Sequence, residues 1–181
     1  MHNKSYFFES QYEKEQYEDW NHIIPLEIKK QLYKEIAKNT NMSVEELQIS
    51  EMCIPSRDSI TALVILAEAI QEVFIHIFNG PLIEGSCAVK IKNKEALIKD
   101  ITIDEGFDED VFDDVWHELI ELAELMCGGG VTYKLETKPI NNNQQEFYHI
   151  EKRAIECGYI IKGKYAEKTI GATLITFGMN I

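Results

Sequence analysis

Hydrophobic residues recur at helical spacing in the first part of the chain. Between residues 26 and 38, Ile28, Leu32 and Ile36 lie four positions apart, with lysines on the opposite side. This spacing puts the three side chains on one face of a helix. Pro25 suits the first turn, where the backbone needs no amide donor. The pattern therefore predicts an amphipathic helix over residues 26–38.

Two further segments also have helical patterns. Residues 108–126 combine a broad apolar stripe with a strongly acidic polar face. Asp108 is placed to cap this helix, because its carboxylate can accept a hydrogen bond from an amide of the first turn. A third helix is predicted over residues 145–157, with Gly158 as its C-terminal cap.

The most apolar segment of the chain, residues 60–78, reads ITALVILAEAIQEVFIHIF. Its polar residues follow one another at a spacing of four: Glu68, Glu72 and His76. We interpret the segment as a long buried helix over residues 59–78, capped by Asp58 or Ser59. Ionisable groups inside a bilayer are costly, and no basic anchors flank the segment, so a membrane span is not expected.

The remaining periodic segments have the alternating pattern of strands, and they cover residues 87–91, 96–103 and 131–139. Helices and strands follow each other without strict alternation. The predicted fold class is α+β: a single domain with a long apolar central helix, an acidic amphipathic helix and a small, mostly antiparallel sheet. An acidic, aromatic arm (residues 1–24) is expected to precede this single domain (residues 25–181).

Composition narrows the class of partner. The chain has 181 residues, 45% of them hydrophobic, and a formal net charge of −13. Such a charge disfavours nucleic acid and anionic membranes as partners and favours basic proteins. Its four cysteines form no CxxC pair, so we expect buried thiols in a reducing cytoplasm. No nucleotide-binding glycine motif is present, and no cofactor is expected.

The acidity is local. Residues 100–131 hold eleven carboxylates and no lysine or arginine, whereas the rest of the chain has 20 acidic and 18 basic residues. Like charges one helical turn apart repel each other weakly, and a basic surface would relieve that repulsion. The residues expected to contact a basic protein partner are Asp110, Asp113, Asp114, His117, Glu118 and Glu121.

These observations favour a binding protein over an enzyme. The hypothesis is an acidic cytoplasmic module, such as an immunity or inhibitor protein that neutralises a basic toxin or nuclease through helix 108–126. Such a protein needs complementary shape and charge, and no catalytic residues. An exposed apolar face on the 59–78 helix would also allow a homodimer. An ordinary solvated helix face explains the same charge run without any partner.

A metal-dependent hydrolase is the alternative function. Two sets of carboxylate and imidazole groups lie at a spacing of four on the two predicted helices: Glu68, Glu72 and His76, and Asp113, His117 and Glu121. If the helices packed together, the two sets could meet in a carboxylate–histidine site. The HELIE sequence at residues 117–121 lacks the second histidine of the zinc-protease motif, so that particular chemistry is not predicted.

Overall fold

The computed structural model describes residues 24–57, 60–137 and 144–171. The chain divides into two compact units after Ser86, and each is treated by itself. The helical elements are α2 (Leu26–Thr40), the short 3-10 helix η1 (Glu68–Ile70), α3 (Glu109–Cys127) and α4 (Gln144–Glu156). The strands are β1 (Ile49–Arg57), β2 (Ile60–Ala67), β3 (Glu72–Asn79), β4 (Leu82–Lys92), β5 (Glu95–Ile103), β6 (Val131–Glu136), β7 (Ile160–Lys162) and β8 (Tyr165–Ile170).

The first unit is an antiparallel sheet covered on one face by α2. Strands β1, β2 and β3 are neighbours, and one row across them joins Cys53, Leu63 and His76. Apolar residues of α2, including Leu32 and Ile36, belong to one buried cluster with Cys53, Leu63 and others of this face. The helical spacing read from the sequence therefore provides the apolar face of α2.

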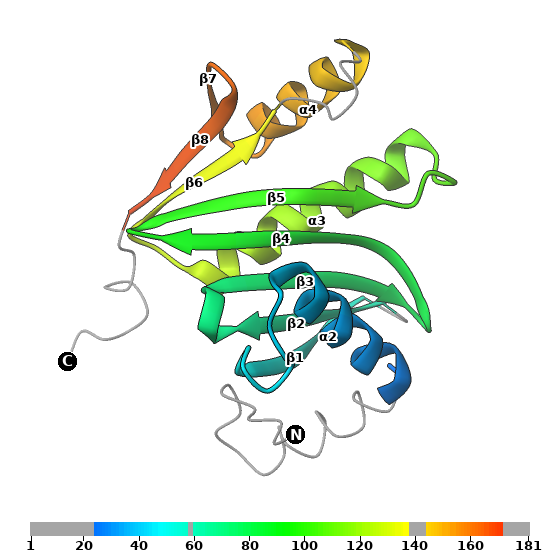
Figure 1. Cartoon of the computed structure of the whole chain (residues 1–181). Coiled ribbons are helices and arrows are strands. Elements are labelled where there is room, and N and C mark those ends of the chain that lie inside the picture. Colours follow the sequence, from blue (N-terminus) through cyan, green and yellow to red (C-terminus); the bar gives the residue numbers. More distant parts are fainter. Residues whose placement is uncertain (1–23, 58–59, 138–143, 172–181) are drawn as a thin grey trace, which may run out of the picture. The chain divides into compact units, whose positions relative to one another are not determined.

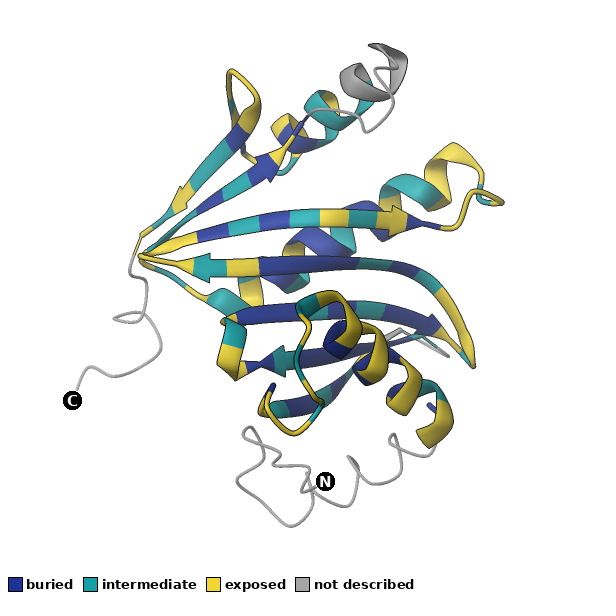
Figure 2. Ribbon diagram, in the orientation of Figure 1, coloured by how far each residue is buried: buried dark blue, intermediate teal, exposed yellow. Residues whose placement is uncertain are grey.

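The long apolar helix predicted over residues 59–78 is wrong. The segment forms β2 and β3, joined by η1 and by Gln71 in a left-handed conformation. β2 is rich in Ile, Leu and Val, and β3 is rich in Ile and Phe; β-branched and aromatic residues suit a pleated sheet. Both are also largely buried (Figure 2), so no alternation of polarity distinguished them from a helix. The proposed caps Asp58 and Ser59 lie outside the described residues.

The second unit contains a β–α–β arrangement. Strand β5 leads through a short turn into α3, and the chain then returns as β6, which pairs with β5 in parallel. Strands β8 and β7 extend this sheet in antiparallel fashion beyond β6. Buried side chains of the strands, such as Ile98, Leu135 and Ala166, and of α3, such as Leu119, form the interior. The sheet of this unit is therefore mixed.

Several predicted elements are confirmed. The helix predicted over residues 26–38 is α2, the acidic helix is α3, and the helix predicted over 145–157 is α4. Asp108 caps α3 by accepting a hydrogen bond from the Val111 amide at 2.9 Å. The strands expected around residues 87–91, 96–103 and 131–139 are β4, β5 and β6.

The predicted fold class, however, is wrong in its main features. Eight strands hold more of the described residues than the helices do, so the sheet is large, and the described chain has no long apolar central helix. The arm expected over residues 1–24 lies, apart from Ile24, outside the described residues. A single domain over residues 25–181 stays a prediction. In the described segments, no helix combines the length and apolar character that crossing a bilayer requires.

Candidate functional site

The parallel strands β5 and β6 separate toward their carboxyl ends. Glu95 to Ile98 of β5 are in register with Thr132 to Leu135 of β6, but β5 continues to Ile103. Figure 1 shows the two strands starting side by side and then diverging. Open sheets commonly bind ligands at the carboxyl ends of parallel strands, where a helix N-terminus also arrives. The open end of the β5–β6 pair is therefore the candidate site.

A backbone irregularity marks the point of separation. Asp100 has a φ of 53°, which is unusual for a residue other than glycine. Before it, the buried residues of β5 are Ala96 and Ile98; after it, the buried residue is Ile103. The alternation of side chains has thus shifted by one residue, as at a β-bulge. Strained backbone of this kind is often found at functional sites.

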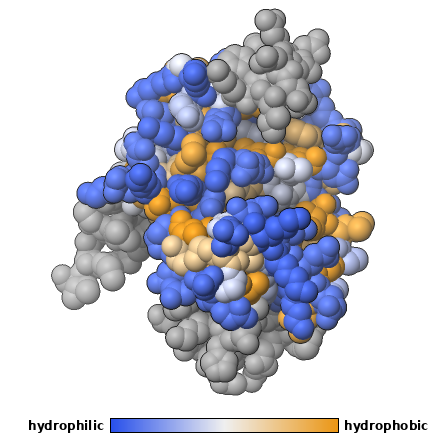
Figure 3. All heavy atoms as spheres, in the orientation of Figure 1, coloured by the Kyte–Doolittle hydropathy of each residue, from blue (hydrophilic) through white to orange (hydrophobic). Residues whose placement is uncertain are grey.

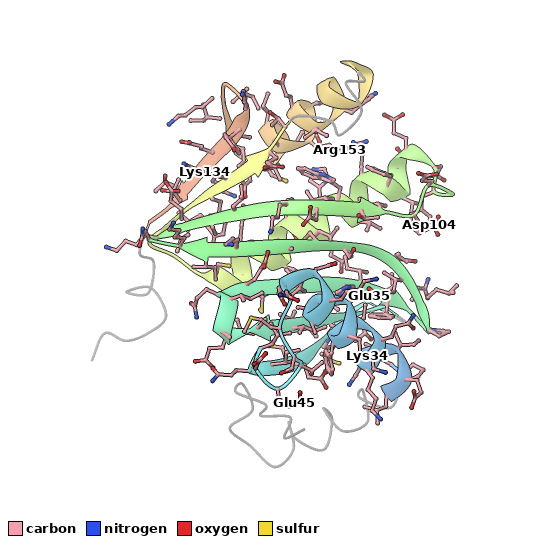
Figure 4. The ribbon with its side chains drawn as sticks, in the orientation of Figure 1. Lys34, Glu35, Glu45, Asp104, Lys134 and Arg153 are labelled. Atoms are coloured by element: carbon pink, nitrogen blue, oxygen red, sulfur yellow. The ribbon has the colours of Figure 1, made fainter. Side chains whose placement is uncertain are left out.

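The N-terminus of α3 lies at the same end, and the chain's own carboxylates occupy its first turn. Asp108 accepts the Val111 amide, and Asp104, labelled in Figure 4, accepts the Gly106 amide at 2.9 Å in the preceding turn. Glu109 and Asp110 follow and are exposed. A helix N-terminus can otherwise bind phosphate through free amides and its positive dipole. Here the carboxylates supply that negative charge, so an anionic ligand group is disfavoured.

The first half of α3 is joined to α4 by a ladder of three contacts between acidic and basic side chains. Its contacts are Glu109–His149 at 3.9 Å, Asp113–Arg153, and His117–Glu156 at 3.4 Å. Residue numbers rise together along both helices, so α3 and α4 run parallel at these contacts. The Arg153 guanidinium also lies over the Phe112 ring, 4.6 Å from its centroid. We call the six residues of these three contacts the α3–α4 ladder.

The last turn of α3 is joined to β8 through Glu124. Lys168 donates to both carboxylate oxygens of Glu124, at 3.0 and 3.1 Å, and the Tyr159 hydroxyl donates to one of them at 2.9 Å. Lys168 also donates to the Cys157 carbonyl in the turn after α4, at 2.9 Å. Burial and the Glu124 charge raise the pKa of Tyr159. This hydroxyl therefore stays protonated and acts as a hydrogen-bond donor.

The cysteines offer no reactive thiolate. All four are free, and burial raises the pKa of Cys53 to about 11 and that of Cys87 to about 12. Burial likewise raises the pKa of Cys127 and of Cys157 to about 11. A thiol with such a pKa is protonated at neutral pH and is a poor nucleophile.

Comparisons with known proteins give little guidance. No protein-family model matches the chain, and no curated protein matches it in sequence. Among solved structures, the chain is similar to a Bacillus subtilis acetyltransferase in complex with CoA, with 17% identity and a TM-score of 0.37. The likeness covers 51% of this chain and 57% of the acetyltransferase chain, so this chain spans little more than half of that structure.

The hypothesis of an immunity or inhibitor protein acting through helix 108–126 is wrong. Two carboxylates of that helix, Asp113 and Glu124, are bound within the chain by Arg153 and by Lys168. Part of the face expected to hold a basic partner is thus engaged by α4 and β8.

The structure places the six residues expected to bind a partner in different surroundings. Asp113 and His117 belong to the α3–α4 ladder, and Glu118 is half-buried. The remaining three are exposed: Asp110, Asp114 and Glu121.

The alternative function, a metal-dependent hydrolase, is also wrong. It required Glu68, Glu72 and His76 to share one face of a helix, but Glu68 lies in η1 and the other two lie in β3. On the other helix, Asp113 and His117 are held by α4. Within the described residues, no group of three or more His, Cys, Asp or Glu side chains is arranged to hold a metal ion.

The sequence did not reveal which basic residues bind the carboxylates of the acidic helix. Arg153 and Lys168 lie 40 and 44 residues from the carboxylates they bind. The local signal was present: Arg153 and His149 are spaced four apart on a predicted helix, as are Asp113 and Glu109. Two matching stripes of opposite charge on separate helices could have suggested that the helices pair.

Proposed function

We propose that this chain binds an elongated, amide-containing ligand along β5, at the open end between β5 and β6. The observation that carries the proposal is the extension of β5 from residue 99 to residue 103, beyond its register with β6. A strand edge presents amide and carbonyl groups in a row, and an extended ligand with its own amides can pair with them. The shift at Asp100 is consistent with a backbone shaped for such an approach.

The negative charge at this end of β5 further restricts the kind of ligand that can bind. Asp104 and Asp108 occupy backbone amides at the start of α3, and Glu109 and Asp110 add exposed negative charge. A phosphate group would meet this charge without free amides to bind it. The ligand is therefore neutral or cationic where it reaches α3. We also assign the protein to the cytoplasm, a proposal supported by its four free cysteines.

An NMR titration tests the proposal with three probes: pantetheine, which is an uncharged diamide; trialanine amide, which is a cationic peptide; and CoA, which joins a pantetheine arm to phosphates. We expect pantetheine or the peptide to shift the backbone amides of residues 99–103 and 135–137. CoA is expected to bind more weakly than pantetheine at low salt. Shifts confined to other residues, or none with any probe, would show that the β5 edge is not a binding site.

Two substitutions at one position provide the matched control. Asp100→Gly keeps the positive φ at low cost, because glycine adopts it readily. Asp100→Val opposes it, because a β-branched residue strongly disfavours that conformation. We expect the valine variant to lose probe binding at least tenfold and the glycine variant to retain it, with both melting cooperatively. Equal binding by the two variants would show that the backbone conformation at residue 100 does not affect ligand binding.

A further inference from the structure

The sheet of the second unit has one face that contacts α3 and one face that points away from it. Tyr133 of β6 donates to the Glu124 carbonyl of α3, and Lys168 of β8 donates to the Glu124 carboxylate. Successive side chains of a strand point to opposite faces, so Lys134 and Glu167 lie on the other face, which we call the Lys134 face. Its described residues in β5, β6, β7 and β8 are all exposed or half-buried.

One row of cross-strand neighbours runs across the middle of the Lys134 face. Leu97 of β5 pairs with Lys134 of β6, and Lys134 pairs with Glu167 of β8. Glu167 in turn pairs with Ile160 of β7, whose residue is 66% exposed. The row therefore reads apolar, positive, negative, apolar. We call these four residues the Leu97–Ile160 row.

This order is complementary to itself about a two-fold axis that runs parallel to the strands, between β6 and β8. When two Lys134 faces pack as two sheets do, such an axis reverses the row of one copy over that of the other. Lys134 of each copy then faces Glu167 of the other, and Leu97 faces Ile160. A two-fold axis along the row would place Lys134 on Lys134, so the charges select the first arrangement.

The next row of the Lys134 face fits the same axis. Glu136 pairs with Tyr165, and Tyr165 pairs with Lys162. About the axis, the Tyr165 hydroxyl of one copy faces the Glu136 carboxylate of the other and can donate to it. Lys162 comes to the level of Lys99, but β5 has left its register with β6 there (Figure 1), which separates the two ammonium groups.

The two central charges are only partly neutralised within one chain. The Lys134 ammonium lies 3.1 Å from Glu95 but 4.0 Å from Oε1 of Glu167, which is too long for a hydrogen bond. Lys162 lies 3.1 Å from the other oxygen of Glu167, Oε2. Oε1 of Glu167 is therefore the oxygen that a second Lys134 can reach.

We propose that the Lys134 face binds a second copy of this chain, in a two-fold dimer centred between β6 and β8. Strand spacing gives the face an area of roughly 400 Å² per copy. This is about half of what a stable interface buries per partner, so the dimer is weak, with a dissociation constant of about 0.1–1 mM. Residues 100–103 of β5 lie beyond the Leu97–Ile160 row, so the candidate site stays open in the dimer.

Charge exchange between two variants tests the dimer. Sedimentation of the full chain at low salt, from 10 μM to 1 mM, should show a monomer–dimer equilibrium that 0.5 M NaCl weakens. Lys134→Glu and Glu167→Lys each turn both central contacts into repulsions, so each alone should weaken association at least about tenfold. Their equimolar mixture should associate to within about threefold of the wild type, because opposite charges meet at both contacts of the mixed dimer.

The matched control is Lys164→Glu, which changes the net charge as Lys134→Glu does. Lys164 is exposed in the turn between β7 and β8, outside the Leu97–Ile160 row, so this variant should associate to within about threefold of the wild type. A wild type that stays monomeric at 1 mM would overturn the proposal. So would single variants that associate like the wild type, or a mixture that associates no better than its components.

A second measurement needs no variant. Backbone amide NMR shifts of the wild type are compared between 50 μM and 1 mM protein. We expect the shifts that change with concentration to cluster at residues 132–136 and 160–169. Changes confined to other residues would show that the copies meet through a different surface.

Discussion

The two compact units use ion pairs in opposite ways. In the first unit, Lys29 and Glu51 form a pair of 3.2 Å whose side chains are 3% and 1% exposed, beneath α2. In the second unit, four charged side chains cross one face of the sheet in the order Glu95, Lys134, Glu167, Lys162, and most are far more exposed (Figure 4 labels Lys134). The difference teaches that burial, more than the number of pairs, decides what a charge contributes.

The pKa of Glu51 supports the view that burial has the larger effect. Burial raises the pKa of Glu51, although the Lys29 ammonium beside it lowers it. The cost of taking the carboxylate out of water therefore exceeds the attraction to its partner. By contrast, most charged residues in the described part of the chain are at least partly exposed, and hydrophilic residues cover much of the coloured surface in Figure 3.

Removing one member of the buried pair is expected to have the largest effect. Lys29→Met leaves the Glu51 carboxylate buried without its ammonium group, at a cost of about 3–5 kcal/mol in the free energy of unfolding. Denaturant unfolding at pH 7 measures this loss. The matched control is Lys30→Met, since Lys30 is exposed on the same helix and should change stability by less than about 0.5 kcal/mol.

A double substitution sharpens the same comparison. Lys29→Met/Glu51→Leu removes both charges and keeps the apolar volume, so it should regain most of the lost stability and can exceed the wild type. If the double variant were as unstable as Lys29→Met alone, the pair would be contributing more than it costs. The contrast drawn between the two units would then fail.

The sequence predicted the helices of this fold better than the strands. Residues 26–38 and 108–126 have polar faces, so their period was visible and both helices were found. Residues 60–78 are buried on both sides of a sheet, so their pattern had no period, and the turn at Glu68–Gln71 contains no glycine or proline. The stripe of Glu68, Glu72 and His76 then supported a helix that does not form.

The candidate site was not predictable in the same way. It depends on where β6 stops following β5 and on the conformation of Asp100, both of which are set by tertiary packing. The acidic stretch was visible, but its partners Arg153 and Lys168 come from segments distant in sequence. Counting charges located the acidic stretch correctly. The count could not show that basic residues elsewhere in the same chain neutralise part of it.

His76 of the first unit gives the second largest expected effect. Burial lowers its pKa from the ordinary 6.5 to about 4, and its Nδ1 is buried with no hydrogen-bond partner. The unfolded chain therefore takes up a proton before the folded one does. Stability is complete above pH 6.5 and falls as the pH drops toward 4, by at most about 3 kcal/mol.

His76→Leu should remove this part of the acid sensitivity. The free energy of unfolding of wild type and variant is compared at pH 7.5 and pH 4.5, so that the titrating carboxylates cancel. Between pH 7.5 and pH 4.5, we expect the free energy of unfolding of the wild type to fall by about 2–3 kcal/mol more than that of the variant. A difference between the proteins that does not change with pH would mean that the folded protein accommodates a charged His76.

The exposed row of charges in the second unit, Glu95, Lys134, Glu167 and Lys162, is expected to respond least to substitution. Lys134 lies 3.1 Å from Glu95 and 4.0 Å from Glu167, but all three side chains contact water, which weakens the attraction. Lys134→Met should therefore lower the melting temperature by no more than about 2 °C, and 0.5 M NaCl should abolish even this difference because salt screens exposed charges. A loss comparable to that of Lys29→Met, or one that persists in salt, would show that this exposed row of charges acts as a cooperative network. Burial would then no longer explain why the two units differ.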